Sequence, residues 1–191
     1  QPIPDEELAA LTEYVRPHAD AMADSPTEFE LITALAMVWF ARQKCDIVVL
    51  EVGMGGELDS TNIIDVPEAA VIAAMGMDHV KELGPTMADI ARAKAGIIKE
   101  GGRVVSYGGN LEADEVIAAV CRARNASLCQ PDFSAIVPGD FGLEGQTFSY
   151  KGWRGLRIPL VGAYQMNNAA VVLETVEVLR QRGWSVSDEA V

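Results

Sequence analysis

A carboxylate and a glycine-rich loop follow an apolar run in the first third of the chain. Residues 45–52 have the composition of a buried strand, and the stretch LEVGMGGELDSTN places Glu51 at the end of that run, with Asp59 further along. Glycines let a backbone approach a ligand closely, so this stretch predicts a ligand site. The alternative for Glu51 is a solvated strand end or a carboxylate that caps a helix.

A second segment carries a carboxylate and an imidazole to a comparable position. Residues 69–75 are predicted to form another strand that ends at Met75, and Asp78 and His79 follow in the sequence GMDH. Ligands of open parallel sheets gather beyond the carboxyl ends of the strands, so we expect Glu51, Asp59, Asp78 and His79 to share one rim. A single histidine is more often a structural hydrogen-bonding residue, but its place after a predicted strand favours a function.

Lys94 lies in the segment ADIARAKAGII, among small and apolar residues. Lysines are mostly surface residues. Apolar surroundings, however, favour the neutral amine, which is the nucleophilic form. Two further candidates have simple structural explanations. Phe29 lies at the start of the helix predicted at 27–44 and could simply be a residue of the hydrophobic core. The polar residues Gln165 and Asn168 at the start of another helix could serve only to cap it.

Alternating helices and strands are expected to position these residues. The periodicity predicts helices at 5–22, 27–44, 86–95, 112–125 and 164–182, and strands at 45–52, 69–75, 103–107 and 127–129. This order is typical of an α/β fold with a mostly parallel sheet flanked by helices. The helix at 27–44 is apolar almost all round, which predicts burial. Residues 131–160 alternate between short segments and Gly or Pro, and predict a small antiparallel β segment.

Composition narrows the classes of protein. The chain has 191 residues, 49% of them hydrophobic, which is enough for one domain with its own core. A net charge of −13 argues against nucleic acid or an anionic membrane as partner. No apolar run reaches the roughly 18 residues of a membrane span. Three cysteines without a C-x-x-C pair indicate reduced thiols and a cytoplasmic protein.

Two nucleotide motifs are missing from the sequence. Leu58 stands where G-x-G-x-x-G needs its third glycine, so a dehydrogenase is the weakest interpretation. No G-x-x-x-x-G-K-[ST] phosphate loop occurs in the chain. The sequence begins without Met and ends on SVSDEAV, which predicts a helix start with Ser187 as N-cap. We therefore expect a piece of a longer protein.

Five segments in this order resemble the folylpolyglutamate synthase and dihydrofolate synthase family, which are ATP-dependent amide ligases of the wider Mur-ligase group. The segments are TEFE, DIVVLEVGMGGELDSTN, GMDHVKELG, IARAKAGIIK and GAYQMNNAA. The resemblance implies that residues 1–191 form a single domain, part of a central ATPase domain with a fold like that of P-loop NTPases. The phosphate-loop strand would lie upstream and a C-terminal domain downstream. It also implies a monomeric full-length enzyme and a chain that is almost inactive alone.

The resemblance implies specific chemistry. ATP phosphorylates a carboxylate of dihydropteroate or a folate, and the amine of L-glutamate attacks the acyl phosphate. Catalysis would fall to Glu51, which binds one Mg²⁺, and to His79 and a carbamylated Lys94, which serve a second. Asn168 would contact the adenine of ATP, with Gln165 nearby. The pterin end would meet three substrate-binding residues: Phe29, Thr27 and Asp59.

Three positions depart from the family pattern. Glu57 stands where the family usually has Arg, Tyr164 where it has His, and Ala93 where it often has Glu. The first departure inverts a charge beside the substrate pocket and bears on substrate choice. Two alternatives stay open: another Mur-type ligase acting on cell-wall UDP-peptide precursors, and a noncatalytic fold fragment that binds metal weakly.

Overall fold

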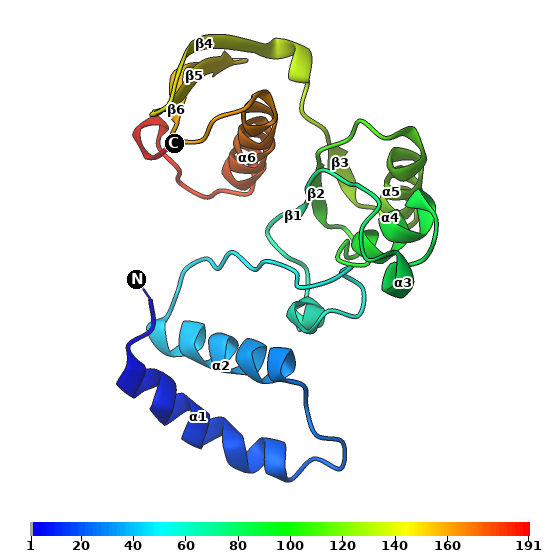
Figure 1. Ribbon diagram of the computed structural model, residues 1–191, viewed down its shortest axis with the longest axis vertical. Coiled ribbons are helices and arrows are strands. Elements are labelled where there is room, and N and C mark those ends of the chain that lie inside the picture. The colour runs from blue at the N-terminus through cyan, green and yellow to red at the C-terminus, as the bar shows by residue number, and fades with distance from the viewer. Residues whose placement is uncertain (1) are drawn as a thin grey trace. The chain divides into compact units, whose positions relative to one another are not determined.

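The computed structural model describes residues 2–191, and the chain divides into two compact units (Figure 1). The first unit comprises the chain up to Gly53 together with Asp59–Ile63. The second comprises Met54–Leu58 and Ile64–Val191. The prediction of a single domain over residues 1–191 therefore stays a prediction.

Two helices make up most of the first unit. They are α1 (Asp5–Asp20) and α2 (Glu28–Gln43), and a short 3-10 helix, η1 (Ser60–Ile63), contacts α2. A capping box starts α2, because the Thr27 hydroxyl accepts from the Glu30 N–H while the Glu30 carboxylate accepts from the Thr27 N–H at 2.7 Å. Both predicted helices are confirmed.

The predicted burial of α2 is wrong. Thr33 is its one buried residue, and Phe29 and Ile32 are exposed. The physical reason lies in its neighbours. Within the first unit α2 packs mainly on α1 and η1, which cannot cover a helix that is apolar on all sides.

The predicted strand at 45–52 is also wrong. The segment makes no ladder with any strand of residues 2–191, and Val49 is 93% exposed. A strand forms only when its backbone N–H and C=O groups find a neighbouring strand. The apolar sequence supplies strand propensity here, but no described segment supplies the partner.

A three-stranded parallel sheet forms the centre of the second unit. Its strands are β1 (Ala70–Ile72), β2 (Arg103–Ser106) and β3 (Ser127–Cys129), in the order β1-β2-β3. Val105 lies in the middle of the sheet, paired with Val71 on one side and Cys129 on the other. The parallel α/β prediction is confirmed, although β1 is shorter than the predicted 69–75.

Helices cover both faces of this sheet (Figure 1). On one face Val104 packs with Ile98 and with Ile117 of α5 (Leu111–Ala123), next to α4 (Met87–Ala95). On the other face Val105 packs with Val171 of α6 (Ala163–Gln181). Successive strand residues point to opposite faces, which explains why adjacent valines serve different helices.

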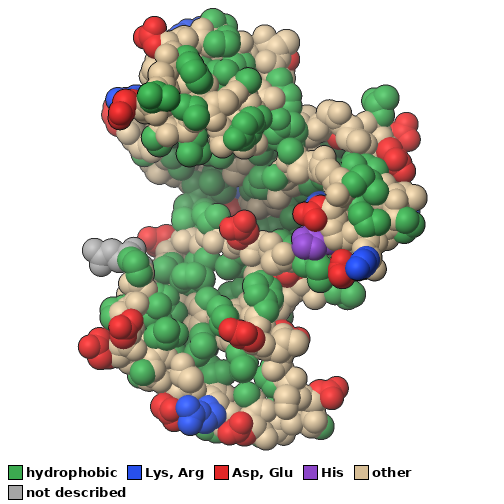
Figure 2. Space-filling view, viewed as in Figure 1, with side chains coloured by type: hydrophobic (Ala, Val, Ile, Leu, Met, Phe, Trp, Pro, Cys, Tyr) green, Lys and Arg blue, Asp and Glu red, His purple; other side chains and the backbone are tan. Residues whose placement is uncertain are grey.

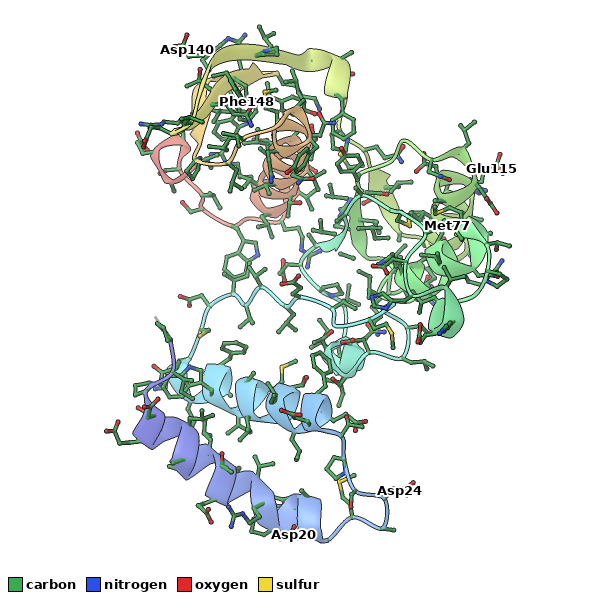
Figure 3. All side chains as sticks on the ribbon, in the orientation of Figure 1. Asp20, Asp24, Met77, Glu115, Asp140 and Phe148 are labelled. Atoms are coloured by element: carbon green, nitrogen blue, oxygen red, sulfur yellow. The ribbon has the colours of Figure 1, made fainter. Side chains whose placement is uncertain are left out.

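A second, antiparallel sheet packs on the far side of α6. It consists of β4 (Ile136–Gly142), β5 (Gly145–Tyr150) and β6 (Trp153–Ile158), in that order. Phe148 points from β5 toward α6, where it packs with Met166 and Leu173 (Figure 3). The antiparallel segment predicted at 131–160 is confirmed, and α6 lies between two sheets.

Three short helices complete the second unit: α3 (Val80–Leu83), η2 (Phe133–Ala135) and η3 (Asp188–Ala190). Ser187 precedes η3 as predicted, but its side chain makes no capping hydrogen bond. Among residues 2–191, the helices are too short or too polar to cross a lipid bilayer.

Candidate functional site

The glycine loop docks on the C-terminal end of α4, the helix that carries Lys94. A Cβ on Gly56, whose φ is +154°, would lie 3.0 Å from the carbonyl oxygens of both Ala93 and Lys94. A Cβ on Gly55, at φ +68°, would lie 2.9 Å from Leu83 Cδ2 in α3. The two glycines therefore allow a close approach of backbone to helix, which larger residues would prevent.

Glu57 and Gly96 add to the close contact between the glycine loop and the end of α4. The Glu57 N–H donates to the Ala93 carbonyl at 2.9 Å. A Cβ on Gly96 would lie only 2.3 Å from Glu57 Cβ, too close for two carbons that are not bonded to each other, so one of them would have to move. The loop thus fixes the last turn of α4, and with it the backbone of Lys94.

His79 adopts an uncommon backbone conformation. Its φ is 49° and its ψ is 38°, in the left-handed region, directly before α3. Asp78 stabilises this turn: Oδ1 accepts the His79 N–H at 2.8 Å, and Oδ2 lies 3.6 Å from His79 Nε2. Strained residues of this kind concentrate at functional sites.

The predicted strand-end position of His79 needs a correction. β1 ends at Ile72, so six residues separate the strand from His79, where three were expected between Met75 and His79. Lys94 lies half-buried in the last turn of α4, and α3 contacts α4. Glu51 belongs to the first unit. Its predicted meeting with His79 and Lys94 stays a prediction.

Phe29 and Asp59 meet at Gly53 in the first unit. A Cβ on Gly53 would lie 2.6 Å from Phe29 Cζ, so the ring occupies the space that a side chain would fill. The Gly53 N–H donates to Asp59 Oδ2 at 3.0 Å. Phe29 is 43% exposed, so its interpretation as a core residue is wrong for this unit. These contacts of Gly53 were not predicted from the sequence, although Gly53 comes two residues after the candidate Glu51.

Asp59 and Thr27 also have local structural roles. Asp59 Oδ1 accepts from the Thr61 N–H at 2.9 Å and so starts η1. Thr33 Oγ1 lies 2.9 Å from Ser60 Oγ, which joins α2 to η1. Thr27 caps α2. These bonds hold η1 against α2 and start both helices, and substrate contacts of Thr27 and Asp59 stay predictions.

The N-terminal turns of α6 carry Gln165 and Asn168. Asn168 Nδ2 donates to Gln165 Oε1 at 3.2 Å, and Asn168 is exposed. The N-cap is Gly162 at φ +112°, a glycine with no side chain to cap the helix, and a capping role for Gln165 or Asn168 stays a prediction. The first turn contains no acidic residue. Its backbone N–H groups and the helix dipole favour a polar or anionic ligand.

Sequence reasoning missed a buried carboxylate in α6. Glu174 is 6% exposed and accepts hydrogen bonds from the Tyr150 hydroxyl (2.7 Å), the Lys151 ammonium and the Cys129 thiol (3.3 Å). Burial acts to raise the pKa of Glu174, but these three donors outweigh it and hold the pKa below its usual value. The available signal was an acidic residue inside an apolar helix.

Acidic side chains are spread over the visible surface, with few basic ones among them (Figure 2). Among residues 2–191, no three His, Cys, Asp or Glu side chains gather as a metal-binding group. The predicted metal ligands include a lysine and come from both units. The metal site therefore stays a prediction.

Comparison with protein families gives a match over most of the chain. Residues 9–176 match the family model described as the Mur ligase middle domain. The match spans both compact units.

Two relatives of this chain are both named as folylpolyglutamate synthases. The dihydrofolate synthase/folylpolyglutamate synthase of Bacillus subtilis is 37% identical over 200 residues, covering 99% of this chain and 46% of that protein. The folylpolyglutamate synthase of Lacticaseibacillus casei is 37% identical over 202 residues, with 99% and 46% covered. The chain thus spans about half the length of these relatives.

Solved structures extend the similarity to three dimensions. A folylpolyglutamate synthase (FPGS) complex with AMPPCP and folate aligns with a TM-score of 0.89 and 35% identity, covering 100% of this chain and 49% of that one. The enzyme from Thermotoga maritima aligns with a TM-score of 0.86 and 30% identity, covering 100% and 44%.

Proposed function

Because the chain belongs to the Mur ligase middle-domain family, we propose that it is the central ATPase part of an ATP-dependent folate–glutamate ligase. The observation that carries this proposal is the similarity over its whole length to a synthase bound to AMPPCP and folate. The rest of the enzyme would supply the phosphate loop, which this sequence lacks, and a C-terminal domain. The chain alone would be almost inactive, and the full-length protein would be a cytoplasmic monomer.

The reaction joins an acid to an amine in two steps. An oxygen of the substrate carboxylate attacks the γ-phosphorus of ATP, which forms an acyl phosphate and releases ADP. The amine of L-glutamate then attacks the carbonyl carbon, and the C–O bond to phosphate breaks to leave an amide. The acid is dihydropteroate, a folate or a folylpolyglutamate.

The donor chemistry of the site fits Mg²⁺. Glu51 offers an exposed carboxylate, and His79 offers an exposed imidazole with Asp78 beside it. Lys94 as an ammonium would repel a cation, whereas a carbamate on its nitrogen would supply the oxygen ligand that Mg²⁺ prefers. Bound Mg²⁺ offsets the negative charge that develops during phosphoryl transfer.

The remaining residues bind the two ends of the substrates. Phe29 would place its exposed ring against the flat pterin, with Asp59 and Thr27 as polar neighbours. Gly53 supports this arrangement, since it leaves room for the ring and also holds Asp59. Asn168, steadied by Gln165, would contact the adenine of ATP.

Substrate-dependent ADP release from the full-length protein tests the proposal. We expect ADP release with glutamate and either dihydropteroate or a folate, and none with a UDP-sugar peptide. The reverse preference would indicate a cell-wall ligase instead. Comparing dihydropteroate with folate then shows whether the enzyme adds the first glutamate, later ones, or both.

Titration with Mg²⁺ separates the enzyme from a noncatalytic fold fragment. Glu51→Ala and His79→Ala should each weaken Mg²⁺ binding in the presence of ADP. Unchanged affinity in both variants would favour a fragment that serves only as a packing partner.

A further inference from the structure

One hydrogen bond joins the end of β2 to the first turns of α6. Asn167 Nδ2 donates to the Tyr107 hydroxyl at 3.0 Å across 60 residues of sequence. Tyr107 directly follows β2, and Asn167 lies next to Asn168. The bond therefore connects the carboxyl end of the parallel sheet with the turn that carries Gln165 and Asn168.

The bond continues the regular packing of α6 on the sheet. Val105 and Val171 share one buried cluster, and Tyr107 packs against it. Two residues along a strand advance about 6.6 Å, and four residues along a helix advance about 6 Å. The steps from Val105 to Tyr107 and from Val171 back to Asn167 therefore match. α6 runs opposite to β2, and its N-terminal turns lie at the carboxyl end of that strand.

Two further contacts hold Tyr107 in place. Its N–H donates to the Ile72 carbonyl of β1 at 2.8 Å, and its ring lies 4.7 Å from that of Phe133, centroid to centroid. Gly108 and Gly109 follow at φ +73° and +87°, so the chain turns away immediately after it. Tyr107 is thus a fixed point at the sheet edge, able to locate a helix that packs on it.

The opposite side of the α6 start has a different support. Gln146 Nε2 of β5 donates to the carbonyls of Leu160 and Gly162, each at 2.9 Å. That support comes from the antiparallel sheet and holds the chain before the helix. Among the side-chain bonds described for these turns, only the Tyr107–Asn167 bond connects them to the parallel sheet. Nucleotide chemistry is expected at the carboxyl end of that sheet.

We propose that Tyr107 and Asn167 are positioning residues for nucleotide binding, which place Asn168 relative to the carboxyl edge of the parallel sheet. The proposal rests on the proposed function, in which Asn168 contacts adenine. Neither residue touches the nucleotide in this role. Each acts through the position of the helix.

The test measures ADP affinity and Michaelis constants in the full-length protein. Tyr107→Phe removes one hydroxyl and keeps the ring contact with Phe133, and Asn167→Leu removes its partner. Each should weaken ADP binding about 3- to 10-fold, the range expected for one hydrogen bond. The double variant should stay within about twofold of either single, since both remove the same bond. The KM for ATP should rise while the KM for the folate substrate stays unchanged.

Tyr150→Phe provides a matched control. It also removes a tyrosine hydroxyl that bonds a side chain of α6, but at Glu174, two turns further along the helix. It should lower the melting temperature and leave ADP affinity within about twofold, because its bond lies away from the adenine residues.

Asn168→Ala tests the adenine contact of Asn168 separately from the positioning role of Tyr107 and Asn167. Weaker ADP binding in Asn168→Ala, with unchanged binding in Tyr107→Phe and Asn167→Leu, overturns the positioning role and leaves the proposed function intact. Additive losses in the double variant also overturn it. Unchanged ADP binding in Asn168→Ala removes the adenine contact, and the positioning role is lost with it.

Discussion

The Tyr150 hydroxyl donates a 2.7 Å hydrogen bond to Oε1 of Glu174, a carboxylate almost wholly inside the second unit. Lys151 and the Cys129 thiol complete its set of donors. The four residues come from α6, from the antiparallel sheet and its β5–β6 turn, and from the parallel sheet. Glu174 therefore joins both sheets to the helix between them.

Replacement of Glu174 should destabilise the protein in a graded way. Glu174→Ala leaves the Tyr150 hydroxyl buried without an acceptor and should cost about 1–3 kcal/mol in the free energy of unfolding. Glu174→Gln keeps an acceptor oxygen and should cost less. Urea unfolding followed by circular dichroism measures both. Glu115→Gln, on the outer side of α5 (Figure 3), is the control and should change stability by less than about 0.5 kcal/mol.

Tyr150 should give the protein a specific alkaline limit. Burial and the neighbouring Glu174 raise the pKa of Tyr150 to about 12. The folded state thus holds this proton more tightly than the unfolded chain, whose tyrosine pKa is about 10. Its stabilising effect is complete below pH 10 and is lost as the pH rises from about 10 to 12.

The measurement is unfolding stability against pH, together with phenolate absorbance. Tyr150→Phe should be less stable at neutral pH and should lose less on going to alkaline pH. It should also lack the late phenolate phase near pH 12. A phase of equal size in both proteins would contradict the assignment.

Gly96→Ala should loosen the joint between the glycine loop and α4. The new Cβ would collide with the backbone and Cβ of Glu57, so the loop must move. We expect a loss of about 1–3 kcal/mol in unfolding free energy, as for other overpacked sites, and reduced ligase activity. Gly152→Ala is the matched control, because a Cβ there meets no atom within 4 Å. An equal effect of both variants would contradict the close contact.

His79→Gly should separate stability from function. Glycine adopts the left-handed conformation of His79 without strain, so folding stability should stay within about 0.5 kcal/mol. Loss of the imidazole should lower metal affinity about 10- to 100-fold or more. Asn125→Gly, at a φ of 47°, is the matched control and should leave metal affinity unchanged. Metal binding equal to wild type in His79→Gly would remove His79 from the site.

Periodicity in the sequence predicted the helices well. In the structure two of them begin with complete capping boxes, formed by Thr27 with Glu30 and by Thr86 with Asp89. The segment at 45–52 shows the limit of such signals, because strand formation depends on a partner that propensity does not reveal. The exposure of α2 has the same origin.

Some site residues could be proposed from the sequence, whereas other contacts could be found only from the structure. Glu51, His79 and Lys94 could be proposed from their motifs, but their meeting at one site involves both units and stays a prediction. The bonds of Tyr150 to Glu174 and of Tyr107 to Asn167 join residues 24 and 60 positions apart. No local sequence pattern predicts contacts between residues so far apart in the chain, so these bonds could be found only from the fold.

The most direct test of the account is the crystal structure of the full-length protein with ADP and Mn²⁺, with the metal located by anomalous scattering. We predict one Mn²⁺ bound by the Glu51 carboxylate. A second should lie beside His79 and a carbamylated Lys94. The account would be contradicted if these three side chains pointed to different faces of the molecule, with no Mn²⁺ beside any of them.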